Sequence, residues 1–243
     1  MILKNYFKWV WEYNKRKRQA FIIGFAAKYR DEIGHYLDLG CDDGGFTKKI
    51  AKASGSRPFG IEINEKRGVK ARKRGIIVKN TDLNEKFPYK SDYFDLITAD
   101  QVIEHLVDVD SFVSEIKRVL KPKGKLVICT ENLASWHNIF ALMLGIQPFT
   151  GPDVSSKYPV GFHPIGPKNS KESMYKTNLE DLENHKGVMT YKSLVKLFRA
   201  HKFRNVRGYG FGYIPLPPII GDLLGNINKS HSQFILITAE NKK

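Results

Sequence analysis

The stretch YLDLGCDDGGF, residues 36–46, constrains the fold more than any other part of the chain, and a helical pattern follows it at once. An apolar run ends at Asp38, and Gly40, Gly44 and Gly45 form a tight turn. Glycine lets a backbone approach a ligand, and the start of a helix presents unpaired N–H groups. The stretch therefore predicts a strand, a turn and a helix start that together bind a cofactor.

Acids around this turn favour a cationic ligand over a dinucleotide. Dinucleotide sites have glycine at the second position of G-x-G-x-x-G, whereas this chain has Asp42 there, and a carboxylate repels a pyrophosphate. Asp38, two residues before Gly40, is a second acid at the strand end. Such acids suit the ammonium or sulfonium group of S-adenosylmethionine, so a dehydrogenase is the least favoured class.

Two further strands are predicted to end in acids. PFGIEIN (58–64) contains Glu62, which lies 24 residues after the acid of the first strand. An acid about 20 residues on accepts ribose hydroxyls in βαβ nucleotide sites. IIVKNTD (76–82) ends in Asp82, which can accept the adenine amino group, while the N–H of Leu83 reaches a ring nitrogen. A plain surface charge or a turn cap is the alternative at both positions.

The next segments continue the alternation of strand and helix. FDLITADQV (94–102) is predicted to be the fourth strand, and a helical pattern starting near Val109 follows it. We expect Pro122 and Gly124 to stop that helix, and KLVICTEN (125–132) to be the fifth strand. This alternation predicts a parallel sheet with helices on both faces.

The last part of the chain has a different pattern. Residues 191–202 are predicted to be helical, and the segments 203–214 and 232–240 to be two strands with no helical pattern between them. These strands should pair antiparallel at one sheet edge. The long insert, 133–190, is expected to be a lid or binding element, with the apolar segment 214–225 beside it.

Basic residues cluster in two places in this chain, whose net charge is +15. Residues 1–30 hold eight Lys and Arg against one Glu, and residues 64–79 hold seven against one. Like-charged helix faces are common without a partner, so we attribute these clusters to solvated surfaces. Residues 5–33 are predicted to form a helix, ended by Gly34, that caps the cofactor end of the domain; contact with a membrane surface is the alternative.

The two cysteines indicate in which cellular compartment the protein lies. Cys41 and Cys129 both fall in predicted core elements, which is no disulfide framework. The N-terminal segment has no small-residue cleavage site, and no apolar run is long enough to span a bilayer. These features predict a cytoplasmic protein.

Five motifs resemble, in order and spacing, those of class I S-adenosylmethionine-dependent methyltransferases: YLDLGCDDGGF, GIEIN, NTDL, FDLITADQVIEHL and EIKRVLKPKGKLVICTEN. The resemblance implies an α/β fold with a Rossmann-like, doubly wound, seven-stranded sheet in three α/β/α layers. Its strand order would be 3-2-1-4-5-7-6, with strand 7 antiparallel. It also implies a helical cap (1–34), a cofactor-binding core (35–132 and 191–243) and a lid or substrate insert (133–190).

The resemblance implies that residues at the strand ends bind S-adenosylmethionine. They are Asp38, Gly40, Cys41 and Gly44 for the methionine part, Glu62 and Ile63 for ribose, Asp82 and Leu83 for adenine, and Asp100 and Gln101 for methionine or acceptor. Asp42 stands where the family usually has glycine. Aspartate tolerates left-handed backbone better than most residues, so we expect the turn to survive.

The segment QVIEHL resembles ubiquinone-type O-methyltransferases, in which two acids and a histidine hold a divalent metal. Gln101 replaces the first acid here, which leaves Glu104 and His105, so we predict no metal. His105 is the first candidate for a general base toward a hydroxyl. The other candidates lie in the insert and are His137, His163 and His185.

Three hypotheses about function follow from the resemblance. The first is methyl transfer to a small or lipid-like acceptor, with oxygen as the expected acceptor atom and the insert as lid. The second is an RNA methyltransferase that uses the basic surface, and the third is a non-catalytic domain that binds cofactor or a partner protein. No appended RNA-binding module is visible, which favours the first.

Overall fold

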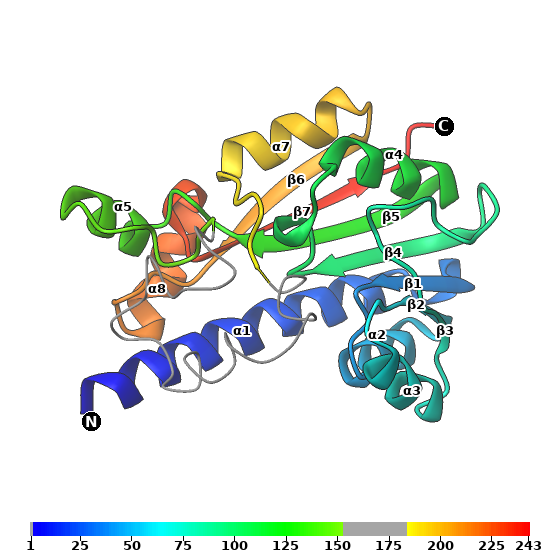
Figure 1. The fold of residues 1–243 in the computed structure, drawn as a ribbon, viewed down its shortest axis with the longest axis horizontal. Helices are drawn as coiled ribbons and strands as arrows, with labels where there is room; N and C mark the ends of the chain where they lie inside the picture. Colours follow the sequence, from blue (N-terminus) through cyan, green and yellow to red (C-terminus); the bar gives the residue numbers. More distant parts are fainter. Residues whose placement is uncertain (1, 153–183) are drawn as a thin grey trace.

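A sheet of seven strands forms the centre of the computed structural model, which describes residues 2–152 and 184–243 (Figure 1). Residues 153–183 of the predicted lid, with His163, lie outside the described residues. The strands are β1 (His35–Leu39), β2 (Arg57–Ile61), β3 (Ile77–Lys79), β4 (Phe94–Asp100), β5 (Leu120–Glu131), β6 (Arg204–Phe211) and β7 (Phe234–Glu240). The α-helices are α1 (Ile2–Lys28), α2 (Gly45–Ser54), α3 (Glu65–Lys73), α4 (Val109–Val119), α5 (Trp136–Met143), α7 (Tyr191–Ala200) and α8 (Pro218–Ile227), with 3-10 turns η1 (Arg30–Glu32), η2 (Ile103–His105) and η4 (Lys229–His231).

The order of the strands is β3-β2-β1-β4-β5-β7-β6, as predicted. The pairs from β3 to β5 are parallel, and β7 runs antiparallel to both β5 and β6, which confirms the expected edge pair. Parallel strands end at the same edge of a sheet, so the polar residues that follow β1, β2 and β4 are brought together there.

Side chains of β1 alternate between two hydrophobic cores, one on each face of the sheet. Leu37 packs with residues of α4 and α7, whereas Tyr36 packs with residues of α1 and α2. Figure 1 shows the same division, with α4 and α7 on one side of the sheet and α1, α2 and α3 on the other. Because strand residues point alternately to opposite faces, this pattern gives the predicted three layers.

Several predicted boundaries were wrong by a few residues. The helix α4 ends at Val119, and β5 begins at Leu120, before the Pro122 that was expected to stop the helix. Leu120 is fully buried and pairs with Phe94, so tertiary packing starts the strand early. β2 and β3 end at Ile61 and Lys79, which places the acids that follow them on loops.

The expectation of no helix between the last two strands was also wrong, because α8 occupies Pro218–Ile227. Proline is favoured in the first turn of a helix, and Pro218 fits there without losing a hydrogen bond. The N-terminal helix ends at Lys28, earlier than predicted, and the 3-10 turn Arg30–Glu32 leads on toward Gly34. The predicted element types are otherwise retained.

Gly44 is the N-cap of α2 and has a left-handed backbone, with φ of +78°. A Cβ added there would lie 2.9 Å from Ala71 Cβ and would also meet Ile76. The glycine therefore allows α2 to approach α3, and only a residue without a side chain fits. Gly75 has a similar φ of +89°, but an added Cβ would meet nothing within 4 Å.

We predict that Gly44→Ala lowers the free energy of unfolding by about 3 kcal/mol or more, because backbone strain and an overlap act together. The control Gly75→Ala should lose only about 1 kcal/mol, since it carries the strain alone. Urea unfolding followed by circular dichroism measures both. Equal losses in the two variants would contradict the close approach of α2 and α3.

Candidate functional site

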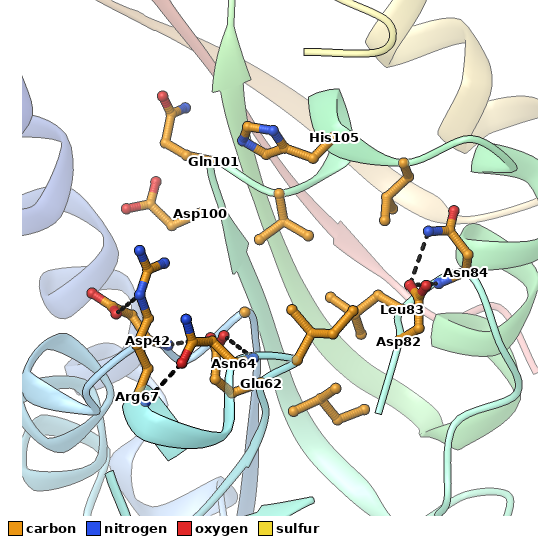
Figure 2. A pocket seen from close by; sticks show the side chains of 15 residues that line it. Asp42, Glu62, Asn64, Arg67, Asp82, Leu83, Asn84, Asp100, Gln101 and His105 are labelled. Atoms are coloured by element: carbon orange, nitrogen blue, oxygen red, sulfur yellow. Dashed lines mark hydrogen bonds and ion pairs between the residues drawn. The ribbon is translucent and has the colours of Figure 1, made fainter. Parts of the chain in front are cut away.

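A cavity of about 460 Å³ lies at the carboxyl ends of β1, β2 and β4. Figure 2 shows its wall, where polar side chains from the strand ends and the loops that follow face one space. The predicted site residues that line it are Gly40, Glu62, Ile63, Asp82, Leu83, Asp100, Gln101 and His105. Asp42, Asn64, Arg67 and Asn84 also line it, and the sequence analysis assigned no ligand contact to them. The volume falls in the range of ligand pockets, about 300–1,000 Å³.

Glu62 is held at the cavity wall by two backbone N–H groups. The N–H of Asp42 donates to Oε2 and the N–H of Asn64 to Oε1, each at 2.9 Å. Burial raises the pKa of Glu62, and these two hydrogen bonds oppose the rise. The carboxylate is thus oriented in advance and can accept further hydrogen bonds from hydroxyl groups.

Asp42 occupies the expected left-handed backbone, with φ of +46°. Its side chain points away from the turn and forms an ion pair with Arg67 at 3.4 Å. The N–H of Asp42 donates a hydrogen bond to Glu62, and the Asp42 carboxylate forms an ion pair with Arg67 of α3, the helix that follows β2. The turn therefore keeps its shape with aspartate at this position.

Asp82 lies on the loop after β3, on the opposite side of the cavity from Asp42 (Figure 2). The backbone N–H and the side-chain amide of Asn84 both donate to its Oδ1, at 2.8 and 2.9 Å. Asn84 Oδ1 in turn accepts from the N–H of Val107, which follows η2. This chain of bonds joins two loops and fixes Asp82 at the cavity wall beside Leu83.

Asp38 lies behind the cavity wall, buried under the glycine turn. Thr47 and Thr98 each donate a hydroxyl hydrogen bond to it, both at 2.6 Å, and Tyr36 donates to Thr98 at 2.7 Å. Burial raises the pKa of Asp38 to about 7, against the effect of the two threonines. Asp38 therefore links β1, β4 and α2. Its charge, when the carboxyl group is ionised, acts on the cavity from behind the wall.

Cys41 and Gly44 also lie outside the lining. Cys41 is buried, its Sγ sits where a Cβ on Gly60 would lie, and burial raises the pKa of its thiol. A buried thiol of this kind is a packing group rather than a nucleophile. Gly44 is the N-cap of α2, so both residues shape the turn from within.

Asp100 and Gln101 end β4 beside a cation that the sequence analysis did not single out. Arg18 of α1 is only 3% exposed and pairs with Asp100 Oδ2 at 3.1 Å. Asp100 Oδ1 and Gln101 Nε2 are buried and have no hydrogen-bond partner among the described residues. Gln101 has a left-handed φ of +63°, and strain of this kind gathers at functional sites.

Glu104, His105 and His185 form a cluster beside the part of the cavity that His105 lines. Their ligand atoms all lie within 4.8 Å of one another, and the two imidazole rings are 5.0 Å apart. His185 comes from the end of the insert and was named only as one of several histidines. The prediction of no metal counted Glu104 and His105 alone and did not include His185; it stays a prediction. His137 is buried and stacks on Phe149.

Part of this chain is similar in sequence to known methyltransferases. A family model described as a methyltransferase domain matches residues 37–128. Sterol 24-C-methyltransferase ERG6B of Gibberella zeae is 35% identical over 95 residues, which are 36% of this chain and 25% of that protein. The ubiquinone/menaquinone biosynthesis C-methyltransferase UbiE of Burkholderia mallei is 30% identical over 102 residues, 39% of this chain and 42% of that protein.

The family match thus places a methyltransferase domain in residues 37–128, which are less than half of this chain. A solved S-adenosylmethionine-dependent methyltransferase from Archaeoglobus fulgidus has the same fold, with a TM-score of 0.57 and 17% identity over 93% of this chain and 92% of that one. The chain matches less than half the length of the two curated relatives, and S-adenosylmethionine is the cofactor of the family.

The residues that line the cavity fit S-adenosylmethionine by their geometry. Gly40 lines it with φ of +72°, and a Cβ there would lie 2.6 Å from Val102 Cγ2, so only glycine keeps this side open. Glu62 and Asp82 offer oriented oxygens for hydroxyl and amino groups. Asp100 at the wall and Asp38 behind it are acids, which suits a ligand that carries positive charge.

The raised pKa of Asp38 predicts that the ligand-free protein loses stability as pH rises. The folded state holds this proton up to a pKa of about 7, and the unfolded chain releases it near 3.8, so the folded state binds more protons between these values. The loss approaches about 1.4 kcal/mol per pH unit.

Asp38→Asn should flatten this dependence, because the amide does not titrate. Urea unfolding at pH 5 and pH 7.5 measures the difference between the two proteins. Glu104 and Glu131, whose pKa values burial raises to about 6 and about 8, act in the same direction in both. Parallel curves for the two proteins would contradict the burial of an ionisable Asp38.

Proposed function

We propose that the protein transfers a methyl group from S-adenosylmethionine to an oxygen atom of a small or lipid-like acceptor. The observation that carries the proposal is the acid-lined cavity, which ends at His105. Residues of four loops converge there, and the acceptor would enter beside η2. The assignments of individual residues below are part of this proposal.

The acids of the wall would hold the cofactor by charge and by hydrogen bonds. Glu62 would accept the ribose hydroxyls and Asp82 the adenine amino group, with Leu83 packed against the ring. Asp38 and Asp100 would favour the positive methionine end. Bound there, the cofactor supplies an electrophilic methyl group, whose bonding electron pair goes to sulfur as the acceptor oxygen bonds to carbon.

His105 would take the proton of the acceptor hydroxyl. Its Nδ1 faces the carbonyl oxygen of Asn184 at 3.2 Å, and a carbonyl only accepts, so Nδ1 carries the proton of the neutral ring. Nε2 then has the lone pair that a general base needs. Alignment of acceptor and methyl contributes several kcal/mol more.

Exposed apolar side chains on two helices support a lipid-like acceptor. On α5 and the residues after it they are Trp136, Phe140, Leu142, Met143, Leu144 and Ile146, and on α8 they are Ile219, Ile220, Leu223 and Ile227. Both helices lie at the same end of the molecule as the N-terminal half of α1 (Figure 1). Trp136 contacts His231 of η4, which packs against α8, so the two faces are linked.

This apolar end also adjoins the basic N-terminal helix, on which Lys8 and Trp9 are exposed. Such a surface suits contact with a lipid layer more than entry of a free polar solute. Among the described residues, no helix is both long and apolar enough to cross a bilayer.

Carbon is the second candidate for the acceptor atom, because both curated relatives are named as C-methyltransferases. The wall residues that would hold the cofactor serve either reaction. The difference lies at the acceptor end, where a half-buried base, His105, favours a hydroxyl.

We predict that Glu62→Ala weakens S-adenosylmethionine binding at least tenfold, because two hydroxyl hydrogen bonds to a charged group are lost. Isothermal titration calorimetry measures the affinity. The control Glu65→Ala removes a nearby exposed acid that pairs with Arg72 and does not line the cavity, so its affinity should match the wild type. Wild-type affinity in the Glu62 variant would refute the site.

We predict that methyl label from S-adenosylmethionine enters the solvent-extractable lipid fraction of a cell extract, in an alkali-resistant methyl ether. His105→Ala should slow this transfer about 100-fold while cofactor affinity is unchanged. Mass spectrometry of the product distinguishes an O-methyl from a C-methyl group. Label in RNA alone, or in no fraction, would contradict the proposed acceptor.

A further inference from the structure

A second cavity, of about 490 Å³, lies between α1 and the strands β5, β7 and β6. It shares no lining residue with the cavity at the strand ends. Lys125, which lines it, pairs with Leu96 early in β4, whereas the first cavity adjoins Asp100 at the end of that strand. The second cavity therefore lies toward the amino ends of the parallel strands. We propose that it binds a nucleotide, which is a function beyond methyl transfer and independent of it.

One face of α1 forms a wall of this second cavity. The lining residues from the helix recur at helical spacing and are Phe21, Gly24, Phe25, Lys28 and Tyr29. Residues three, four, seven and eight positions apart share one face of a helix. A Cβ added to Gly24 would meet nothing within 4 Å, so this glycine leaves the wall open. Glycine within a helix costs stability relative to alanine, and the space beside Gly24 gives it a purpose here.

The strands β6 and β7 form the floor of the second cavity. Arg207 and Tyr209 lie two positions apart on β6, so their side chains share one face of the sheet. Thr238 of β7 pairs with Arg207 and also lines the cavity. The floor thus combines a cation, an aromatic ring and a hydroxyl group from neighbouring strands.

Four aromatic rings line the second cavity, those of Phe21, Phe25, Tyr29 and Tyr209. The ring centroids of Phe21 and Tyr209 are 4.4 Å apart, and those of Phe25 and Tyr29 are 5.2 Å apart. All four residues are half-buried, so part of each ring remains accessible to a ligand. A planar base has a π face that stacks on such rings whatever hydrogen-bonding groups it carries.

Three cations and one acid surround these rings. Lys125 donates to Oε1 of Glu240 at 2.9 Å and Asn205 donates to Oε2 at 3.0 Å, so both carboxylate oxygens have a partner. Lys28 of α1 and Arg207 of β6 form no ion pair among the described residues. Each side of the cavity therefore offers a cation that no acid neutralises.

The ring of Tyr29 gathers two ammonium groups at one end of the second cavity. Nζ of Lys125 lies 4.6 Å and Nζ of Lys28 5.6 Å from the centre of that ring. Like charges repel, and an anion bound beside them would offset the repulsion. A phosphate, with up to two negative charges and three acceptor oxygens, suits lysine together with arginine.

A nucleotide combines the two features that this lining offers, since it joins a planar base to a phosphate. An acidic peptide carries the charge without the ring, and a fatty acid lacks the planar face that stacks. The volume falls in the range of small-molecule pockets, about 300–1,000 Å³. Free nucleotides and single-stranded RNA both present this chemistry, so both serve as probes.

The test is binding of uridine monophosphate and of a decauridylate to the full chain, measured by isothermal titration calorimetry. Saturating S-adenosylhomocysteine occupies the first cavity, and the pyrimidine base differs from the adenine of that compound. We expect the wild type to bind, and binding to weaken as salt is raised. Tighter binding of the decauridylate assigns the site to RNA, and equal binding per nucleotide assigns it to the free nucleotide; both results support the site.

Three variants and a matched control decide where the probe binds. Arg207→Ala and Lys28→Ala should each bind at least fivefold more weakly. Gly24→Leu fills the cavity without a change of charge and should bind at least tenfold more weakly. Lys90→Ala removes an exposed lysine that lies over the ring of Tyr93 and does not line the cavity, so its binding should match the wild type.

Circular dichroism checks that Gly24→Leu folds, as the open space beside Gly24 leads us to expect. Failure of the wild type to bind either probe would overturn the site. So would wild-type affinity in Gly24→Leu, or a loss in Lys90→Ala as large as that in Arg207→Ala, because either result indicates attraction to a basic surface alone. Displacement of the nucleotide by an equal concentration of decanoate would overturn the preference for a base. S-adenosylmethionine affinity should be unchanged in every variant, so this proposal and the proposed function can fail separately.

Discussion

The buried carboxylate of Asp38 is the interaction on which the rest of the site depends. It sits at the middle of the sheet and takes hydroxyl hydrogen bonds from Thr47 of α2 and Thr98 of β4. Through these bonds the first strand, its neighbour and the helix after the glycine turn keep one geometry. The turn then presents Gly40 and Asp42 to the cavity, and the N–H of Asp42 orients Glu62. One buried acid thus organises the backbone around the cavity.

The surface of this protein and the wall of its cavity differ in charge. The protein carries a net charge of +15, yet its cavity is walled by acids. Exposed lysines and arginines are solvated and weakly coupled, whereas buried acids act through a medium of lower dielectric constant. The field inside the cavity therefore depends on Asp38, Glu62 and Asp100 rather than on the overall charge. This is why the site can favour a cationic ligand in a strongly basic protein.

Two segments outside the motif region reach the end of β4 and the turn η2. α1 supplies Arg18, which reaches Asp100, and the end of the insert supplies His185, which reaches Glu104 and His105. Apolar helices α5 and α8 lie at the same end of the molecule (Figure 1). The strand ends that line the cavity thus lie in the motif region, whereas α1 and the end of the insert lie outside it. Differences in acceptor among members of one fold arise from such parts.

The sequence by itself determined the alternation of strands and helices, the three layers and most of the residues that line the cavity, and the resemblance of its motifs implied the strand order. Alternating apolar residues and acids at fixed spacing are local patterns, and parallel strands bring their ends to one edge. It could not determine that Asp38 lies behind the wall, nor that β5 begins at Leu120, because both follow from packing. Only the tertiary structure brought Arg18 and His185 to β4 and η2. Contacts between residues about 80 positions apart leave no local pattern in the sequence. The residues near Glu104 therefore give no sign that His185 lies beside it.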